Sequence, residues 1–266
     1  LHYPLRRQRQ MCIRDSPVHA PVLVRIAPDV RARFFVRHLW MPLTGVLLLS
    51  ALLMGAGGDQ WIADVLYRME GGQWLLKEHW FTSGVVHRAG KWLSTTAGVC
   101  VLLLAVAAWF APRRRALRWP LTYLAASIAL STSLVSLLKS WTAMDCPWDL
   151  SRYGGTQAMI GLFESRHGIA ASGCFPAGHA SAGYAWVALY FCALSLRPAW
   201  RFTGLFAGLA AGLIFGIAQQ LRGAHFLSHD LWSLAVCWVS ALALYCVMLA
   251  RPHRARDSML QSGDAA

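Results

Sequence analysis

Long apolar segments separated by short polar ones dominate the chain between residues 39 and 249. Several of them approach the roughly 20 residues that a helix needs to cross the hydrocarbon layer of a bilayer. We expect six membrane-spanning helices, with ends defined to within a few residues. Their expected ranges are 39–54, 92–110, 120–141, 177–196, 202–221 and 231–249.

The composition supports a membrane protein. Of the 266 residues, 56% are hydrophobic and only 14% are charged, and the mean hydropathy is +0.42. A soluble domain carries nearer 25% charged residues. We therefore expect an all-α, polytopic helical bundle over residues 31–250, followed by a cytoplasmic tail over 251–266. The first 20 or so residues show neither apolar periodicity nor a signal-peptide core, so residues 1–30 are interpreted as a disordered tail or an artefact of sequence assembly.

The net charge of +13 comes from short arginine clusters between the apolar segments. The clusters lie before residue 39, at 112–118, at 197–201 and after residue 249, and a chain with six spans brings all four to one face. The positive-inside rule makes that face cytoplasmic, which favours a bacterial inner membrane. No nucleic-acid-binding motif accompanies the charge, so we expect no nucleic-acid partner.

Segments 58–91, 142–176 and 222–230 then lie on the opposite, periplasmic face. In 58–91, tryptophan and aliphatic residues alternate with charged ones at helical spacing. This pattern is typical of an amphipathic stretch in the membrane interface. Either an anchor that supports a lid or a surface that guides a lipid headgroup fits this segment.

Two polar clusters and one lysine interrupt the apolar pattern on this face. Lys139 lies about one turn before the end of its span, where a lysine either snorkels to the headgroups or binds a ligand. Gly178 and His179 open the fourth span, where glycine permits close backbone approach and a histidine can transfer a proton.

The last cluster joins the fifth and sixth spans. Arg222 offers a planar fork of donors for phosphate oxygens, and His225 follows one turn later if the helix continues. His229 and the adjacent Asp230 come four and five residues after His225. Ionisable groups gathered at a membrane end indicate function, and this set indicates phosphate chemistry.

These residues resemble three motifs of the type 2 phosphatidic acid phosphatase superfamily, which shares its helical core with vanadium haloperoxidases. The family patterns are Lys-x6-Arg-Pro, Pro-Ser-Gly-His and Ser-Arg-x5-His-x3-Asp. The matching segments are Lys139-x6-Cys146-Pro147, Pro176-Ala177-Gly178-His179, and Arg222 through Asp230. The resemblance covers about residues 92–249.

The resemblance implies a role for each matching residue. His225 is the expected nucleophile that forms a phosphohistidine, and His179 is the expected general acid. Lys139 and Arg222 are expected to hold the phosphate oxygens, helped by the backbone around Gly178. Such a site needs no metal and no other cofactor.

The sequence departs from the family patterns at several positions. Cys146 replaces the arginine of the first motif, and Arg152 is the cation that we expect to substitute for it. Ala177 replaces a serine. Arg222 lies three residues before His225 rather than six, and Gln219 occupies the usual arginine position. In the third motif, either His229 or Asp230 is expected to orient His225.

Of the seven cysteines, Cys146 and Cys174 are the two in the expected periplasmic segments. They are expected to form a disulfide in that oxidising compartment. A metal site of these cysteines and His179 is the alternative, which no ligand spacing supports.

We expect a phosphatase that acts on a lipid phosphomonoester or pyrophosphate, with the membrane and its lipid phosphate as partners. Phosphatidic acid, phosphatidylglycerol phosphate, undecaprenyl pyrophosphate and lipid A phosphates all suit this site. A lipid phosphotransferase and a non-catalytic lipid-binding or transport protein are the alternatives. The sequence does not indicate an oligomeric state.

Overall fold

The computed structural model describes residues 28–142, 144–161, 164 and 172–250. Most of the expected tails, 1–30 and 251–266, therefore lie outside the described residues. The main helices are α1 (Pro28–Phe35), α2 (Met41–Ser50), α3 (Gly58–Met69), α4 (Gly90–Phe110), α5 (Arg118–Thr142), α6 (Gly178–Tyr184), α7 (Ala188–Leu196), α8 (Arg201–Leu221) and α9 (Leu227–Leu244). The described residues contain no β-strand, and only one isolated bridge joins Leu150 to Gln157 among them.

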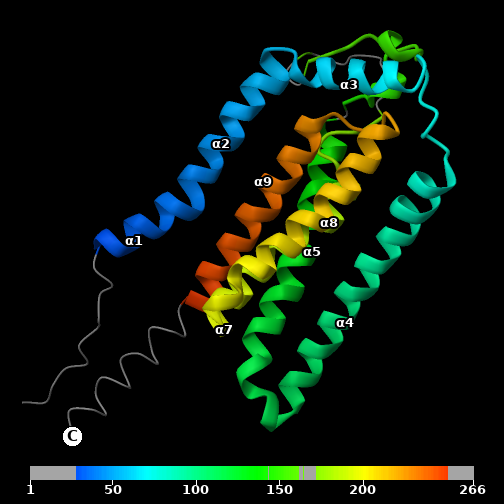
Figure 1. Cartoon of the computed structure of the whole chain (residues 1–266). Coiled ribbons are helices and arrows are strands. Elements are labelled where there is room, and N and C mark those ends of the chain that lie inside the picture. The colour runs from blue at the N-terminus through cyan, green and yellow to red at the C-terminus, as the bar shows by residue number, and fades with distance from the viewer. Residues whose placement is uncertain (1–27, 143, 162–163, 165–171, 251–266) are drawn as a thin grey trace, which may run out of the picture.

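Shorter π-helical and 3-10 segments link or extend these helices. They are η1 (Val36–Trp40), η2 (Ala51–Gly55), η3 (Trp80–Ala89), η4 (Pro112–Leu117), η5 (Pro147–Asp149), η6 (Ser151–Tyr153), η7 (Ala185–Val187), η8 (Pro198–Trp200) and η9 (Tyr245–Leu249). The structure is therefore the expected all-α bundle, and Figure 1 shows its long helices lying side by side.

In the described residues, five helical stretches are long and apolar enough to cross a membrane. They are Asp29–Gly55, Trp80–Phe110, Pro112–Asp149, Pro198–Leu221 and Leu227–Leu249. Large apolar side chains such as Leu48, Leu103 and Phe206 are exposed on them, as a lipid-facing surface requires. These features make the chain a membrane protein.

The expected fourth span, 177–196, is not among these five. It forms α6, η7 and α7 in succession, and a 3-10 turn over Ala185–Val187 interrupts the α-helix. This segment lies inside the bundle, where Ala180, Val187 and Phe191 are buried. Because its packing partners are protein, it carries glycine, serine and histidine instead of a continuous apolar surface.

The expected amphipathic stretch 58–91 is two different structures. Residues 58–69 form the short helix α3, whereas η3 begins at Trp80 and continues directly into α4. One long helix thus covers Trp80–Phe110, and its first residues come from the segment expected in the interface. The correction matters because it attaches His87 to a helix of the bundle.

The expected loop 222–230 is also shorter than predicted. Helix α9 begins at Leu227, so His229 and Asp230 lie in its first turn. Asp59 of α3 accepts a hydrogen bond from the backbone N–H of Ser228 (3.0 Å) and so caps this helix from another element. A buried carboxylate bound in this way satisfies one of the N–H groups that a helix start leaves unpaired.

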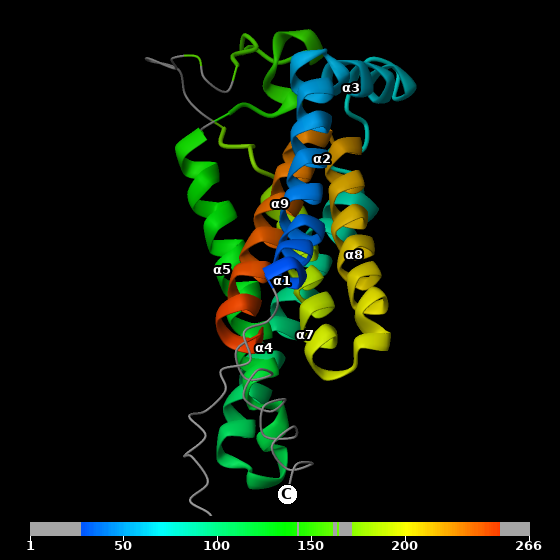
Figure 2. The same cartoon turned by 90° about the vertical axis from the view of Figure 1, so that its left-hand side faces the viewer.

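The polar clusters and the arginine clusters lie at opposite ends of the bundle. Figures 1 and 2 show the α4–α5 and α7–α8 connections at one end, together with the start of α1. At the other end lie α3, the segment after α5 and the α8–α9 connection. The structure therefore has the arrangement of ends that the six-span threading predicts.

Glycines at every fourth position let α8 approach the α6–α7 segment closely. A Cβ atom added to Gly208 would meet the backbone of Val187, and one added to Gly212 would meet the ring of Tyr184. A Cβ atom at Gly216 would meet the carboxylate of Asp230 in α9. Small residues at helix interfaces permit such contacts in membrane proteins.

Candidate active site

Backbone hydrogen bonds join the three motif segments to one another. The N–H of Trp148, after the first motif, donates to the carbonyl of Gly223 (2.9 Å). The N–H of Ala177, in the second motif, donates to the carbonyl of His229 (3.1 Å) in the third. Segments far apart in the sequence thus form one site at the end of the bundle that carries α3.

His225 and His229 form the centre of this site. Their Nδ1 atoms are 3.5 Å apart, and both side chains are buried. Two neutral imidazoles can share such a contact only if one Nδ1 carries a hydrogen and the other accepts it. The rings of Phe175 and Phe226 meet His229 edge-on at 5.2 and 5.4 Å, which fixes its plane.

Asp230 points elsewhere. Its Oδ2 accepts a hydrogen bond from Nε2 of Gln220 (2.5 Å) and faces Gly216 of α8. Of the two residues that sequence reasoning could not separate, His229 is therefore the one that contacts His225. The assignment of Asp230 to the catalytic set is not supported by this geometry.

Burial is the main cause that lowers the pKa of His225 well below its ordinary value near 6.5. The neighbouring His229, Lys139 and His179 act in the same direction, because added positive charge disfavours an imidazolium. The backbone of Cys174 interacts with the imidazole and opposes this shift. His225 is therefore held neutral, the form in which an imidazole nitrogen has a free electron pair.

Lys139 and His179 complete the group. The ammonium of Lys139 is 4.0 Å from the position that a Cβ atom of Gly178 would occupy, so glycine leaves room beside it. His179 follows directly in α6. Since both influence the ionisation of His225, the three expected residues Lys139, His179 and His225 share one small region.

Arg222 takes part in a different way from the one expected. Helix α8 ends at Leu221, and Gly223 has a φ of 68°, so no helical turn connects Arg222 to His225. The Arg222 Nε donates to the carbonyl of Lys77 (2.7 Å), and Nη1 donates to Oε1 of Gln219 (3.2 Å). Its Nη2 lies 4.0 Å from Glu78. The fork expected to hold phosphate therefore holds the 77–78 segment against α8.

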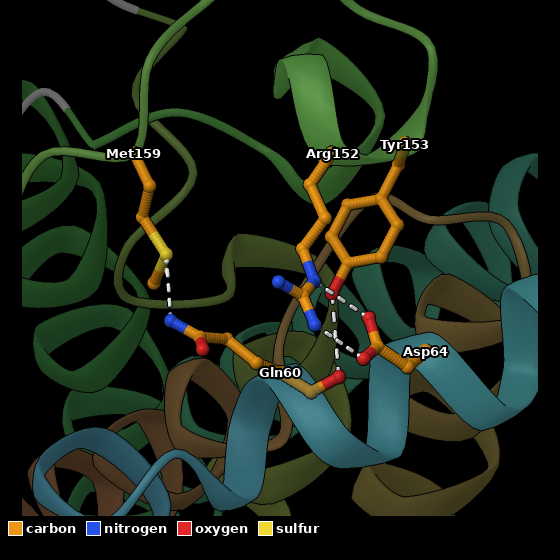
Figure 3. A network of polar contacts seen from close by, with 5 residues as sticks. All are labelled: Gln60, Asp64, Arg152, Tyr153 and Met159. Atoms are coloured by element: carbon orange, nitrogen blue, oxygen red, sulfur yellow. Dashed lines mark hydrogen bonds and ion pairs between the residues drawn. The ribbon is translucent and has the colours of Figure 1, made fainter.

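Arg152 does not substitute for the missing arginine of the first motif. Its Nε and Nη2 donate to the two carboxylate oxygens of Asp64 in α3, at 2.8 and 2.5 Å (Figure 3). These bonds raise the pKa of Arg152, and they lower that of Asp64. Beside this pair, the hydroxyl of Tyr153 donates to the carbonyl of Gln60. Arg152 fastens α3 to the segment after α5.

Cys146 and Cys174 are joined by a disulfide, with their Cα atoms 5.2 Å apart. It connects the first-motif position of the missing arginine to the segment just before the second motif. The backbone of Cys174 interacts with both His225 and His229. The disulfide therefore fixes a backbone segment that contacts the central histidine pair.

His87 is a site residue that the sequence analysis missed. Its ring stacks on that of His179, with the centroids 3.7 Å apart and the planes 28° from parallel. His87 belongs to η3, which the sequence analysis assigned to an interfacial stretch. Only the polarity of a histidine in an otherwise apolar run could have indicated it.

A small pocket borders His225 between α3 and the α8–α9 connection. Its lining residues are Asp59, Ile62, Ala63, Leu66, Trp74, Gln220, His225, Phe226 and Leu227. Burial raises the pKa of Asp59. Within the described ranges, no group of three histidine, cysteine or acidic side chains has an arrangement that could hold a metal ion.

Comparison with known proteins identifies the family. No curated protein and no solved structure matches the chain. A family model described as the PAP2 superfamily matches residues 120–252, which is half of the chain and includes the positions of all three motifs. This chain therefore belongs to the PAP2 superfamily, whose members are generally phosphatases.

Proposed function

We propose that this protein hydrolyses a lipid phosphomonoester or pyrophosphate through a phosphohistidine at His225, without a metal ion. The observation that carries the proposal is the pairing of His225 with His229 beside Lys139 and His179. With Nδ1 of His225 directed at His229, the opposite nitrogen Nε2 is the one available for attack.

In the first step, the electron pair on Nε2 of His225 forms a bond to phosphorus while the bond from phosphorus to the leaving oxygen breaks. His179 donates a proton to that oxygen, so the alcohol or phosphate leaves without extra negative charge. The imidazole of His225 becomes positively charged, and His229 accepts its Nδ1–H hydrogen bond. The ammonium of Lys139 stabilises the negative charge on the transferring group.

In the second step, a water molecule attacks the phosphohistidine. His179 now lacks its proton and takes one from the water as the new oxygen–phosphorus bond forms. The phosphorus–nitrogen bond breaks, its electrons return to Nε2, and inorganic phosphate leaves. Both histidines then have their starting protonation states.

The proposed location is a bacterial inner membrane, with the site facing the periplasm. The arginine clusters lie at the end of the bundle opposite the histidines, which supports this orientation under the positive-inside rule. Phosphatidic acid, phosphatidylglycerol phosphate, undecaprenyl pyrophosphate and lipid A phosphates each present a phosphate at that depth.

Phosphate release from this lipid panel by the purified protein in detergent tests the proposal. The His225→Ala variant is expected to lose activity about a thousandfold or more, because it removes the nucleophile. The His179→Ala variant is expected to lose about 10²–10⁴-fold. His79→Ala provides a matched control, since His79 lies in the same segment as the site residues and contacts only the N–H of Phe81 among the described residues.

The outcomes separate the alternatives. Full release by His225→Ala would overturn the nucleophile assignment. Transfer of phosphate to a second lipid, with little release to water, would indicate a phosphotransferase. Binding of lipid phosphate with neither release nor transfer would indicate a lipid-binding or transport protein.

A further inference from the structure

The cations that the family motifs assign to phosphate are incomplete in this chain. Cys146, which replaces one arginine, is bonded to Cys174. Arg222, the other, directs Nε and Nη1 at Lys77 and Gln219 and lies over the ring of Trp148 at 5.9 Å. Only Lys139 remains as a motif cation with no protein acceptor in the part of the chain that the structure describes.

The helix formed by η3 and α4 brings other polar groups to the same place. The His87 ring stacks on His179 at 3.7 Å, so His87 lies directly beside the expected proton donor. Neither ring nitrogen of His87 has a hydrogen-bond partner among residues 28–142, 144–161, 164 and 172–250. A neutral imidazole always carries one N–H, and here that donor has no protein acceptor.

Lys91 follows His87 by four residues in the same continuous helix, so the two side chains share one face. The Lys91 side chain is exposed, and its charge acts on both His87 and His179. The ammonium can therefore approach a ligand bound beside these rings without first breaking an ion pair in the described structure.

We propose that His87 and Lys91 bind the substrate phosphate beside His179 and so replace the two arginine contacts that this chain lacks. This inference rests on the proposed function, because it assigns the phosphate contacts of the same site. His87 donates its N–H to one phosphate oxygen, and Lys91 contributes a mobile positive charge at the open side. The phosphate clamp then consists of Lys139, His87 and Lys91, which come from two helices.

Binding of orthovanadate tests the proposal without requiring turnover. The probe is the rise in thermal unfolding temperature of the detergent-solubilised protein with increasing vanadate, from which an apparent affinity follows. His87→Phe keeps a flat ring against His179 but removes the N–H, and Lys91→Gln removes the charge. A hydrogen bond to a charged group supports an expected loss of about tenfold or more in vanadate affinity for each variant.

The controls separate binding from support of His179. His79→Phe and Arg113→Gln make the same chemical changes elsewhere and should leave vanadate affinity unchanged. His87→Asn, which keeps a donor group, should recover part of the loss. If His87→Phe and Lys91→Gln both fold and bind vanadate as the wild-type protein does, the proposal is wrong.

Two further outcomes are decisive. Should His87→Phe fail to fold, the exposed Lys91→Gln decides alone, and wild-type vanadate affinity in it overturns the proposal. A wild-type protein that binds vanadate but releases no phosphate from any lipid contradicts the proposed hydrolysis. The loss of vanadate affinity in the variants would still support the clamp in that case.

Discussion

At the scale of single residues, His229 gives this site its distinct chemistry. The family pattern has an aspartate at this position, which would face the nucleophile as an anion. A neutral imidazole accepts the same hydrogen bond but offers no negative charge to a positively charged phosphohistidine. The edge-on contacts with Phe175 and Phe226 compensate in part, because they hold the accepting nitrogen in place.

We predict that His229→Ala lowers kcat on the order of a hundredfold while KM changes little. The variant removes the group that orients His225 but leaves the phosphate contacts in place. His229→Gln should retain part of the activity because its amide oxygen can accept the hydrogen bond. Steady-state kinetics with a short-chain lipid phosphate measure both constants.

Asp230→Asn is the matched comparison for this prediction. Asp230 faces Gln220 rather than His225, so its amide variant should affect thermal stability more than kcat. A larger loss of kcat in Asp230→Asn than in His229→Ala would contradict our assignment of the orienting residue.

The lowered pKa of His225 predicts a pH dependence of stability. Between its folded pKa and about 6.5, the unfolded chain binds a proton at this residue whereas the folded protein does not. The contribution of His225 to stability is therefore full above about pH 6.5 and is lost as the pH falls. Thermal unfolding in detergent from pH 8 to pH 5 measures this decline.

His225→Gln is the control, since glutamine does not titrate. The decline in unfolding temperature towards low pH should be smaller in this variant than in the wild-type protein. An identical decline in both proteins would show that His225 is not the group responsible. The acid limb of kcat/KM in the wild-type protein should likewise lie below pH 6.5, because His225 must be neutral to attack.

At the scale of helices, the glycines of α8 determine how closely the site segments pack. Gly208 faces the backbone of Val187 and Gly216 faces Asp230, so α8 touches both the segment that carries His179 and the helix that carries His229. A side chain on this face of α8 must separate α8 from one of these two segments. The spacing of the catalytic histidines therefore depends on a surface without side chains.

We predict that Gly208→Ala lowers the free energy of unfolding by about 1–3 kcal/mol, because the added methyl group overlaps a backbone that cannot move cheaply. Gly45→Ala in α2 is the control, since a Cβ atom there has no neighbour within 4 Å. The control should be neutral or more stable by up to about 1 kcal/mol, as alanine favours a helix. Equal unfolding temperatures for the two variants would contradict this account.

The helices were predictable where an apolar run faces lipid, and less so where packing within the protein decides. The expected range 202–221 agrees with α8 to within one residue, because its composition alone specifies a span. The residues before Gly90 contain Thr82, Ser83 and Arg88 and appear interfacial, yet they continue the helix. The Thr82 hydroxyl donates to the carbonyl of Leu76, a contact that sequence spacing does not indicate.

The site shows the same division. The sequence motifs identified Lys139, His179, His225 and His229 because their spacing is local and resembles a family pattern. The stacking of His87 on His179 joins two helices distant in sequence, so no periodicity could predict it. The loss of Arg222 to Lys77 and Gln219 likewise depends on where α8 ends and how Gly223 turns the chain.

At the scale of the whole molecule, two independent features indicate the same orientation in the membrane. The arginine clusters lie at one end of the bundle, and the Cys146–Cys174 disulfide lies at the other. Positive loops favour the cytoplasm, whereas disulfides persist in an oxidising compartment such as the periplasm. Neither argument uses the histidines, so their agreement bears on where the active site faces.

We predict that the disulfide forms in cells only when the periplasmic thiol-oxidising system is present. Protein extracted directly into denaturant should gain two alkylatable thiols on reduction, whereas Cys146→Ser should gain none. In cells that lack the oxidising system, the wild-type protein should already be fully alkylated before reduction, and its activity should fall because Cys174 contacts His225 and His229. Full alkylation of the unreduced protein from ordinary cells would contradict the disulfide. A disulfide that persists without the oxidising system would contradict the proposed orientation, because the site would then not depend on the periplasm for its closure.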